Sequence, residues 1–194
     1  MELGELLYVE HRKEWRSWLT KNHKSATEIW LVYYKKHSRK KRIPYNDAVE
    51  EALCFGWIDS TTKPVDNNSW AQRFTPRRPK SALSELNKER VRRLIKAKKM
   101  TKAGLASIAH HMEEDAKKGS GAKELKRFVL PHDILKELKR DPAVWNNFQG
   151  FPEHYKHIRV AWIDGARKRP KEFQKRLRYF IKMTAQNKKF GMVQ

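Results

Sequence analysis

The sequence predicts an α+β fold, in which a small, mainly antiparallel sheet flanked by helices is followed by a C-terminal all-helical lobe. Segments rich in β-branched and aromatic residues, typical of strands, occur in the N-terminal half. Beyond residue 130 the apolar residues recur only at helical spacing. The stretch between the two parts, "GSGAKELKRFVLP", has the composition of a linker. We therefore expect an α+β lobe over 1–118, a linker over 119–130 and a helical lobe over 131–194.

The first elements of the predicted α+β lobe are two strands and a helix. Residues 5–9, "ELLYV", are short enough for an edge strand. Residues 10–23 place Trp15 and Trp18 at helical spacing, so we expect a helix with both tryptophans facing inward. Residues 27–36 are apolar on both faces, which predicts a central strand, and a basic loop follows over 35–44.

A second helix and a hairpin follow. The helix, "YNDAVEEALCFG", is expected to begin at an Asn46 cap, to end at Gly56 and to face inward with Val49, Ala52 and Leu53. The segments "WIDSTT" and "SWAQRFT" then predict two strands joined through "KPVDNN". A hairpin centred near Asn67 places Asp59 opposite Thr75, and Thr61 opposite Arg73.

All later elements are predicted to be helices. The first is capped by Ser84 and the second, "TKAGLASIAHHMEEDAKKG", ends at Gly119. Two short helices divided at Asp141-Pro142 and two longer ones complete the chain. The residues expected to face inward are Val91, Leu94 and Ile95, then Leu105, Ile108, Ala109 and Met112, and finally Tyr155, Ile158, Trp162, Phe173, Leu177, Phe180 and Ile181.

The 194 residues carry a net charge of +22, concentrated in three segments. Residues 35–42, 71–102 and 156–194 hold all of the excess Lys and Arg. Such segments attract polyanions, although a lysine-rich surface can also serve only solubility. No apolar run approaches the ~20 residues that span a bilayer, and the N-terminus lacks a signal-peptide pattern. We therefore expect a cytoplasmic protein without a transmembrane segment; the single cysteine fits a reducing compartment.

One candidate anion-binding pocket lies at the junction of the hairpin and the next helix. Free N–H groups at a helix N-terminus favour an anion, arginines grip phosphate or carboxylate, and hydroxyls add donors. The residues that we expect to contribute are Arg73, Thr75, Arg77, Arg78, Ser81 and Ser84, with Trp57 and Asp59 shaping the site. The alternative is structural: Arg77 or Arg78 pairs with Asp59, and the serines only cap the helix.

Asp59 is the only candidate catalytic residue that we single out. A carboxylate beside arginines is expected to have a lowered pKa, which suits the positioning of an arginine better than proton transfer. Cys54 lies at a helix C-terminus, which disfavours a thiolate, so we expect a core residue. The histidines, including the pair His154 and His157, show no metal-site pattern, and we expect neither a metal nor a cofactor.

Two basic helix faces could follow a phosphate backbone. Because no base-reading motif occurs, nucleic-acid binding is expected to be non-specific. The residues of these faces are Lys88, Arg92, Lys96 and Lys99 on one helix and Lys171, Lys175, Arg178 and Lys182 on the other.

Several blocks of the sequence resemble a known family. "EWRSWL", "EIWLVYYKK", "YNDAVEEALCFGWIDS", "RFTPRR" and "SALSELNKERVRRLI" occur in this order, and the tail contains "LPHDILKELKRDPAVWNNFQGFPEHYKHIRVAWIDGARKR". Together they resemble the YdeI/OmpD-associated, or bacteriocin-protection, family and its C-terminal helical module. The resemblance implies a link to antimicrobial-peptide or envelope stress resistance, and it implies no reaction.

Three functions are therefore open. The first is a binding protein without enzymatic activity that holds an anionic ligand at the hairpin. The second is an enzyme that uses Asp59 and the arginines on a small acidic or phosphorylated substrate. The third is a stress-protection factor acting through a protein partner, and non-specific nucleic-acid binding is compatible with the basic faces.

Overall fold

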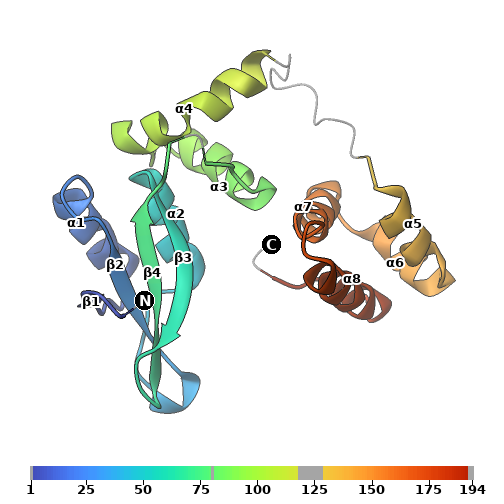
Figure 1. The fold of residues 1–194 in the computed structure, drawn as a ribbon, viewed down its shortest axis with the longest axis horizontal. Coiled ribbons are helices and arrows are strands. Elements are labelled where there is room, and N and C mark those ends of the chain that lie inside the picture. The colour runs from blue at the N-terminus through green and yellow to red at the C-terminus, as the bar shows by residue number, and fades with distance from the viewer. Residues whose placement is uncertain (1, 80, 118–128, 192–194) are drawn as a thin grey trace. The chain divides into compact units, whose positions relative to one another are not determined.

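The computed structural model describes residues 2–79, 81–117 and 129–191, which form two compact units (Figure 1). The first unit comprises Met1–Ala82 with Arg90–Glu114, and the second Leu83–Glu89 with Asp115–Gln194. Most of the predicted linker, 119–130, lies outside the described residues. The lobe boundaries drawn from the sequence therefore stay a prediction.

The first unit contains a four-stranded mixed sheet in the order β1-β2-β4-β3. The strands are β1 (Leu6–Leu7), β2 (Ile29–Tyr34), β3 (Trp57–Pro64) and β4 (Ser69–Pro76). β1 runs parallel to β2, whereas the β2–β4 and β4–β3 pairs are antiparallel. The predicted edge strand and central strand are both confirmed, and with them the α+β fold class.

The register of the β3–β4 hairpin differs from the sequence prediction on one side of a bulge. Near the turn Pro64 pairs with Trp70 and Thr62 with Gln72, as a centre at Asn67 requires. An irregularity between Asp59 and Thr62 then shifts the pairing by one residue. Asp59 therefore lies opposite Phe74 rather than Thr75, and the expected pair of Thr61 with Arg73 is not formed.

Two helices, α1 (Arg12–Asn22) and α2 (Tyr45–Cys54), pack on one face of the sheet. Trp15 is fully buried beside Phe74, its indole N–H donates to the carbonyl of Ala48, and partly buried Trp18 meets Trp57 edge to face. Both tryptophans of α1 face inward, as predicted. This first core also buries the expected α2 stripe Val49, Ala52 and Leu53.

The predicted Asn46 cap is wrong. The N-cap is Pro44 and the helix begins at Tyr45, so Asn46 lies inside the first turn. Its side-chain oxygen instead accepts a hydrogen bond from Arg90 at 2.6 Å. The other end of α2 follows the prediction, because Gly56 adopts a φ of +77° that stops the helix.

The next two helices, α3 (Glu85–Lys96) and α4 (Lys102–Lys117), bury different residues than the pattern predicts. Val91, Leu94 and Ile108 are buried as expected, whereas Ile95, Leu105, Ala109 and Met112 are exposed. In α4 the cause is Gly104, because a Cβ on it would lie 2.1 Å from the carbonyl oxygen of Cys54. This close approach makes Gly104 and Ile108 the buried side of α4. The predicted helix end at Gly119 lies outside the described residues.

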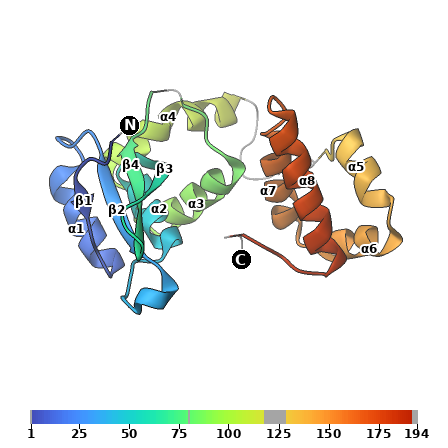
Figure 2. The ribbon, with the colours of Figure 1, turned by 60° about the horizontal axis from the view of Figure 1, so that its bottom comes forward.

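The second unit contains α5 (His132–Lys139), α6 (Pro142–Gly150), α7 (Glu153–Asp164) and α8 (Pro170–Ala185) (Figure 2). The break between α5 and α6 falls where predicted, since Asp141 caps α6 by accepting from the N–H groups of Ala143 and Val144. Its core buries most of the expected stripe, namely Tyr155, Ile158, Phe173, Leu177 and Phe180, with Trp162 and Ile181 partly buried.

Candidate functional site

Asp59 lies on the same face of the sheet as α2, beside the first residue of that helix. The hydroxyl of Tyr45 donates a hydrogen bond to the Asp59 carboxylate. Burial, reinforced by the nearby Asp59 charge, raises the pKa of Tyr45 above its usual value. The phenol therefore stays protonated at neutral pH. The Asp59 carboxylate is thus held in place by the phenol of Tyr45, whereas the sequence predicted that it positions an arginine.

Two further polar groups join this cluster of Tyr45 and Asp59. Arg90 of α3 is 4% exposed, donates to Asn46 and has its pKa lowered by desolvation. Tyr33 of β2 is 1% exposed, and its hydroxyl has no hydrogen-bond partner among the described residues. Burial raises the pKa of Tyr33 as well, with smaller effects from Tyr45 and Asp59. The cluster holds α2, α3 and the sheet together through buried polar contacts.

The predicted anion-binding residues on β4 have partners within the sheet. Arg73 forms an ion pair with Glu28, whose carboxylate also accepts from the indole N–H of Trp30 at 3.0 Å. Hydrogen bonds from Arg73 and then from Trp30 lower the pKa of Glu28. Thr75 is partly buried and pairs with Ile58 in the β3–β4 ladder. The charge of Arg73 is therefore already compensated.

Arg77 has a structural contact of a different kind. Its Nη2 donates to the backbone carbonyls of Ser81 and Ala82, at 3.1 Å and 3.0 Å, while its Nε is buried without a partner among the described residues. Desolvation lowers the pKa of the Arg77 guanidinium. The ion pairs of Asp59 with Arg77 or Arg78 that the structural alternative expects do not occur among the described residues.

The remaining residues of the predicted pocket lie further along the loop. Arg78 is exposed, and Ser81 is partly buried with its carbonyl also facing a ring nitrogen of His111 at 2.9 Å. Ser84 caps α3 by accepting from the N–H of Asn87, as predicted. Ser84 belongs to the second unit and the other five residues to the first. The anion pocket thus stays a prediction.

Trp57 and Cys54 are core residues. Trp57 is 1% exposed and its indole N–H donates to the carbonyl of His23. Cys54 is fully buried, and burial raises the pKa of its thiol to about 11. A thiol in this state is protonated at neutral pH and unreactive, which confirms its expected place in the core.

The two basic faces differ in exposure and pairing. On α3, Lys88 forms an ion pair with Glu85, while Arg92, Lys96 and nearby Lys99 are exposed. On α8 the predicted basic residues are all exposed, and none of them forms an ion pair with a described residue. They are Lys171, Lys175, Arg178 and Lys182.

One buried arginine in the second unit was not predicted from the sequence. Arg159 of α7 is 6% exposed, and three aromatic rings surround its guanidinium. Its Cζ lies 4.9 Å from the centroid of Phe190, 5.6 Å from Tyr155 and 5.9 Å from Trp162. The available signal was its position between Tyr155 and Trp162 in the apolar stripe of "YKHIRVAW", where a charged residue is unusual.

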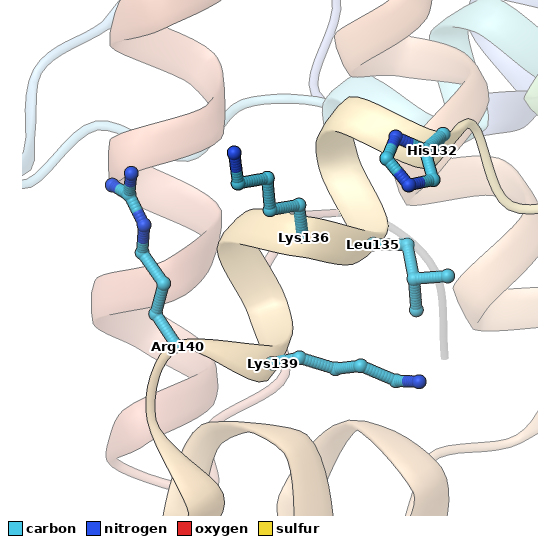
Figure 3. Close-up of a pocket in the computed structure, with 5 residues that line it drawn as sticks. All are labelled: His132, Leu135, Lys136, Lys139 and Arg140. Carbon is cyan, nitrogen blue, oxygen red and sulfur yellow. The ribbon is translucent and has the colours of Figure 1, made fainter.

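The second unit also carries a shallow basic depression along α5 (Figure 3). His132, Leu135, Lys136, Lys139 and Arg140 line it. Figure 3 shows Lys136 and Arg140 on one side of the helix and His132, Leu135 and Lys139 on the other, so the cationic groups do not converge. None of the residues predicted to bind an anion lines this depression.

The fold and these sites define a basic α+β protein whose sheet unit is followed by a helical unit. Residues 7–107 match a family model described as a domain of unknown function (DUF8412), and because this match covers more than half of the chain, the chain belongs to that family. Residues 127–187 match the model described as "Bacteriocin-protection, YdeI or OmpD-Associated", which confirms the resemblance in the C-terminal part. No curated protein and no solved structure matches the chain.

No helix in 2–79, 81–117 or 129–191 is long and apolar enough to pass through a bilayer. Over the same ranges, no three His, Cys, Asp or Glu side chains are grouped so that they could hold a metal ion.

Proposed function

We propose that the chain binds polyanions, nucleic acids foremost, through the outer face of α8 and without sequence preference. The observation that carries this proposal is the local charge balance. The two acidic residues of 156–191 already have arginine partners: Asp164 pairs with Arg167 at 2.6 Å and Glu172 with Arg176 at 2.8 Å. Neither acid forms an ion pair with one of the four exposed cations of α8.

The spacing of these cations fits a phosphate backbone. Lys171, Lys175, Arg178 and Lys182 recur every three or four residues, so they follow one side of a helix of 16 residues. Binding of such a face releases counterions from the polyanion, which makes affinity steeply dependent on salt. The side chains include no pattern that reads base edges, so affinity is expected to be equal for unrelated sequences.

The experiment is a salt titration with labelled single- and double-stranded oligonucleotides of unrelated sequence. If the four cations neutralise about four phosphates, affinity falls about a hundredfold between about 50 and 200 mM salt. The triple variant Lys175→Glu, Arg178→Glu, Lys182→Glu should weaken binding to all sequences alike.

A matched control changes the net charge by the same amount elsewhere. The charges of residues 1–34 sum to zero, and three exposed lysines lie there: Lys13, Lys21 and Lys24. Replacing these three lysines by Glu should leave most of the affinity. Absence of binding at 50 mM salt, or an equal loss in both triple variants, would rule out the proposed α8 surface.

A further inference from the structure

Arg159 is a buried cation in the second unit that forms no ion pair with an acidic side chain of the described residues. Its Nε is fully buried and has no hydrogen-bond partner among the described residues. Each acidic side chain of 129–191 has another partner. Asp133 and Asp164 pair with Arg167, Glu137 with Arg140, Glu153 with Lys156 and Glu172 with Arg176, while Asp141 caps α6.

Aromatic rings compensate only part of this charge. Cation–π contacts stabilise a guanidinium through its faces, but its five N–H donors lie in its plane and need acceptors. No hydrogen bond joins the Arg159 guanidinium to any residue that the structure describes. Burial of donors without acceptors is costly, and desolvation accordingly lowers the pKa of Arg159.

The chain beyond α8 closes one side of this guanidinium. The N–H of Phe190 donates to the hydroxyl of Tyr155 at 3.1 Å, which fixes the segment against α7. Gly191 follows with a φ of +73°, and a Cβ on it would lie 2.7 Å from Nη1 and 2.8 Å from Nη2 of Arg159. Glycine adopts this φ without strain and leaves the guanidinium its space. The tail therefore fits around the guanidinium without supplying an acidic group from its described residues.

We propose that Arg159 is the anchor of a binding site for a carboxylate attached to an apolar or aromatic group. A planar guanidinium accepts a carboxylate through two parallel hydrogen bonds. One negative charge balances one buried positive charge, whereas a phosphate dianion leaves one charge uncompensated in an apolar surrounding. Trp162 and Phe190, which are partly buried beside the guanidinium, provide the apolar contacts for the group that carries the carboxylate. This site is independent of the exposed basic face of α8.

The probes are benzoate, N-acetylphenylalanine, inorganic phosphate and benzamide, each titrated into the full chain at constant ionic strength. The readout is the ¹H–¹⁵N signal of the Arg159 Nε–H group, which burial protects from exchange. Benzoate or N-acetylphenylalanine should shift this signal saturably, and benzamide, which lacks the charge, should not. Tighter binding of benzoate indicates a free acid as the ligand, and tighter binding of N-acetylphenylalanine indicates a peptide C-terminus; either result supports the site.

Two variants test the role of Arg159 with the same carboxylates, monitored through the ring and indole signals of Tyr155 and Trp162. Arg159→Lys keeps the charge but loses the planar fork, and should weaken binding about tenfold or more. Arg176→Lys is the control, because Arg176 also lies over Trp162, at 4.7 Å, but already has Glu172 and the Trp162 carbonyl as partners. It should keep the affinity.

Three outcomes would overturn the proposal. They are a shift that grows linearly without saturation, phosphate binding as tight as carboxylate binding, and unchanged affinity in Arg159→Lys. The spectrum of each variant shows whether it is folded. If Arg159→Lys does not fold, the probe series on the unchanged protein still decides between a carboxylate site and a purely structural arginine.

Discussion

At the scale of single residues, the hydrogen bond from Tyr45 gives Asp59 a partner that the sequence did not indicate. The bond links the start of α2 to β3 and has a charged acceptor, so it should contribute more than an average hydrogen bond. We expect Tyr45→Phe to lower the free energy of unfolding by about 1–2 kcal/mol, measured by urea denaturation at pH 7. Tyr179→Phe, at an exposed tyrosine of α8, should change it by less than about 0.5 kcal/mol.

Tyr45 also makes the free energy of unfolding depend on pH in the alkaline range. Burial raises the pKa of Tyr45 in the folded state, so the folded protein holds this proton more tightly than the unfolded chain. Its contribution is complete below the ordinary tyrosine pKa of about 10 and is lost as the pH rises above it. Stability should therefore fall above pH 10, and less steeply in Tyr45→Phe. An identical decline in the two proteins would contradict this role of Tyr45.

The sequence singled out Asp59 as a candidate but could not identify its partner. The partner, Tyr45, is the first residue of α2, and its contact depends on how that helix packs on the sheet, which the alternation of side chains in β3 does not reveal. Arg159 was missed for a related reason. A helical pattern shows that a position faces inward, but not whether a side chain there has a counter-charge.

At the scale of elements, the packing of α4 on the C-terminus of α2 depends on a missing side chain. Gly104 lies against the backbone of Cys54, and Thr101 donates to the same carbonyl at 2.6 Å. Backbone cannot move aside as a flexible side chain can. We expect Gly104→Ala to destabilise the protein by about 1–3 kcal/mol or more, seen as a lower midpoint of thermal or urea unfolding.

Gly150 provides the matched comparison at the end of α6. No atom lies within 4 Å of a Cβ placed there, and its φ is not positive, so alanine fits the existing backbone. Gly150→Ala should leave stability unchanged or raise it by up to about 1 kcal/mol, because alanine restricts the unfolded chain and favours the helix. Equal losses in both variants would show that close approach is not the cause at Gly104.

The contact between Gly104 and Cys54 also explains why the apolar pattern predicted the wrong inward face for α4. Large apolar residues predict the buried side of a helix, but in α4 only Ile108 of the large predicted residues is buried, while Leu105 and Met112 are exposed. The buried side is instead chosen by the glycine that lets two backbones approach. In α8 no such contact occurs among the described residues, and the stripe Phe173, Leu177 and Phe180 is buried as the periodicity predicts.

At the scale of the whole molecule, two cores with no residue in common form around the sheet and within α5–α8. We expect their stabilities to respond separately to mutation. Leu53→Ala and Leu177→Ala should each cost about 2–5 kcal/mol in their own core. Hydrogen exchange followed by mass spectrometry should show lost protection in β2 and β4 for the first variant and in α6–α8 for the second. Equal loss throughout the chain in both variants would contradict separate units.

The two edge strands of the sheet, β1 and β3, influence whether copies of this chain aggregate. An unpaired edge strand is a template on which a second molecule can add its own strand, the first step of aggregation. Here β1 offers only two residues, and β3 offers a strand interrupted by its bulge, with Lys63 and then Pro64, which has no N–H to donate. The bulge that moves Asp59 out of its expected register thus also hinders edge-to-edge pairing between the sheets of two molecules.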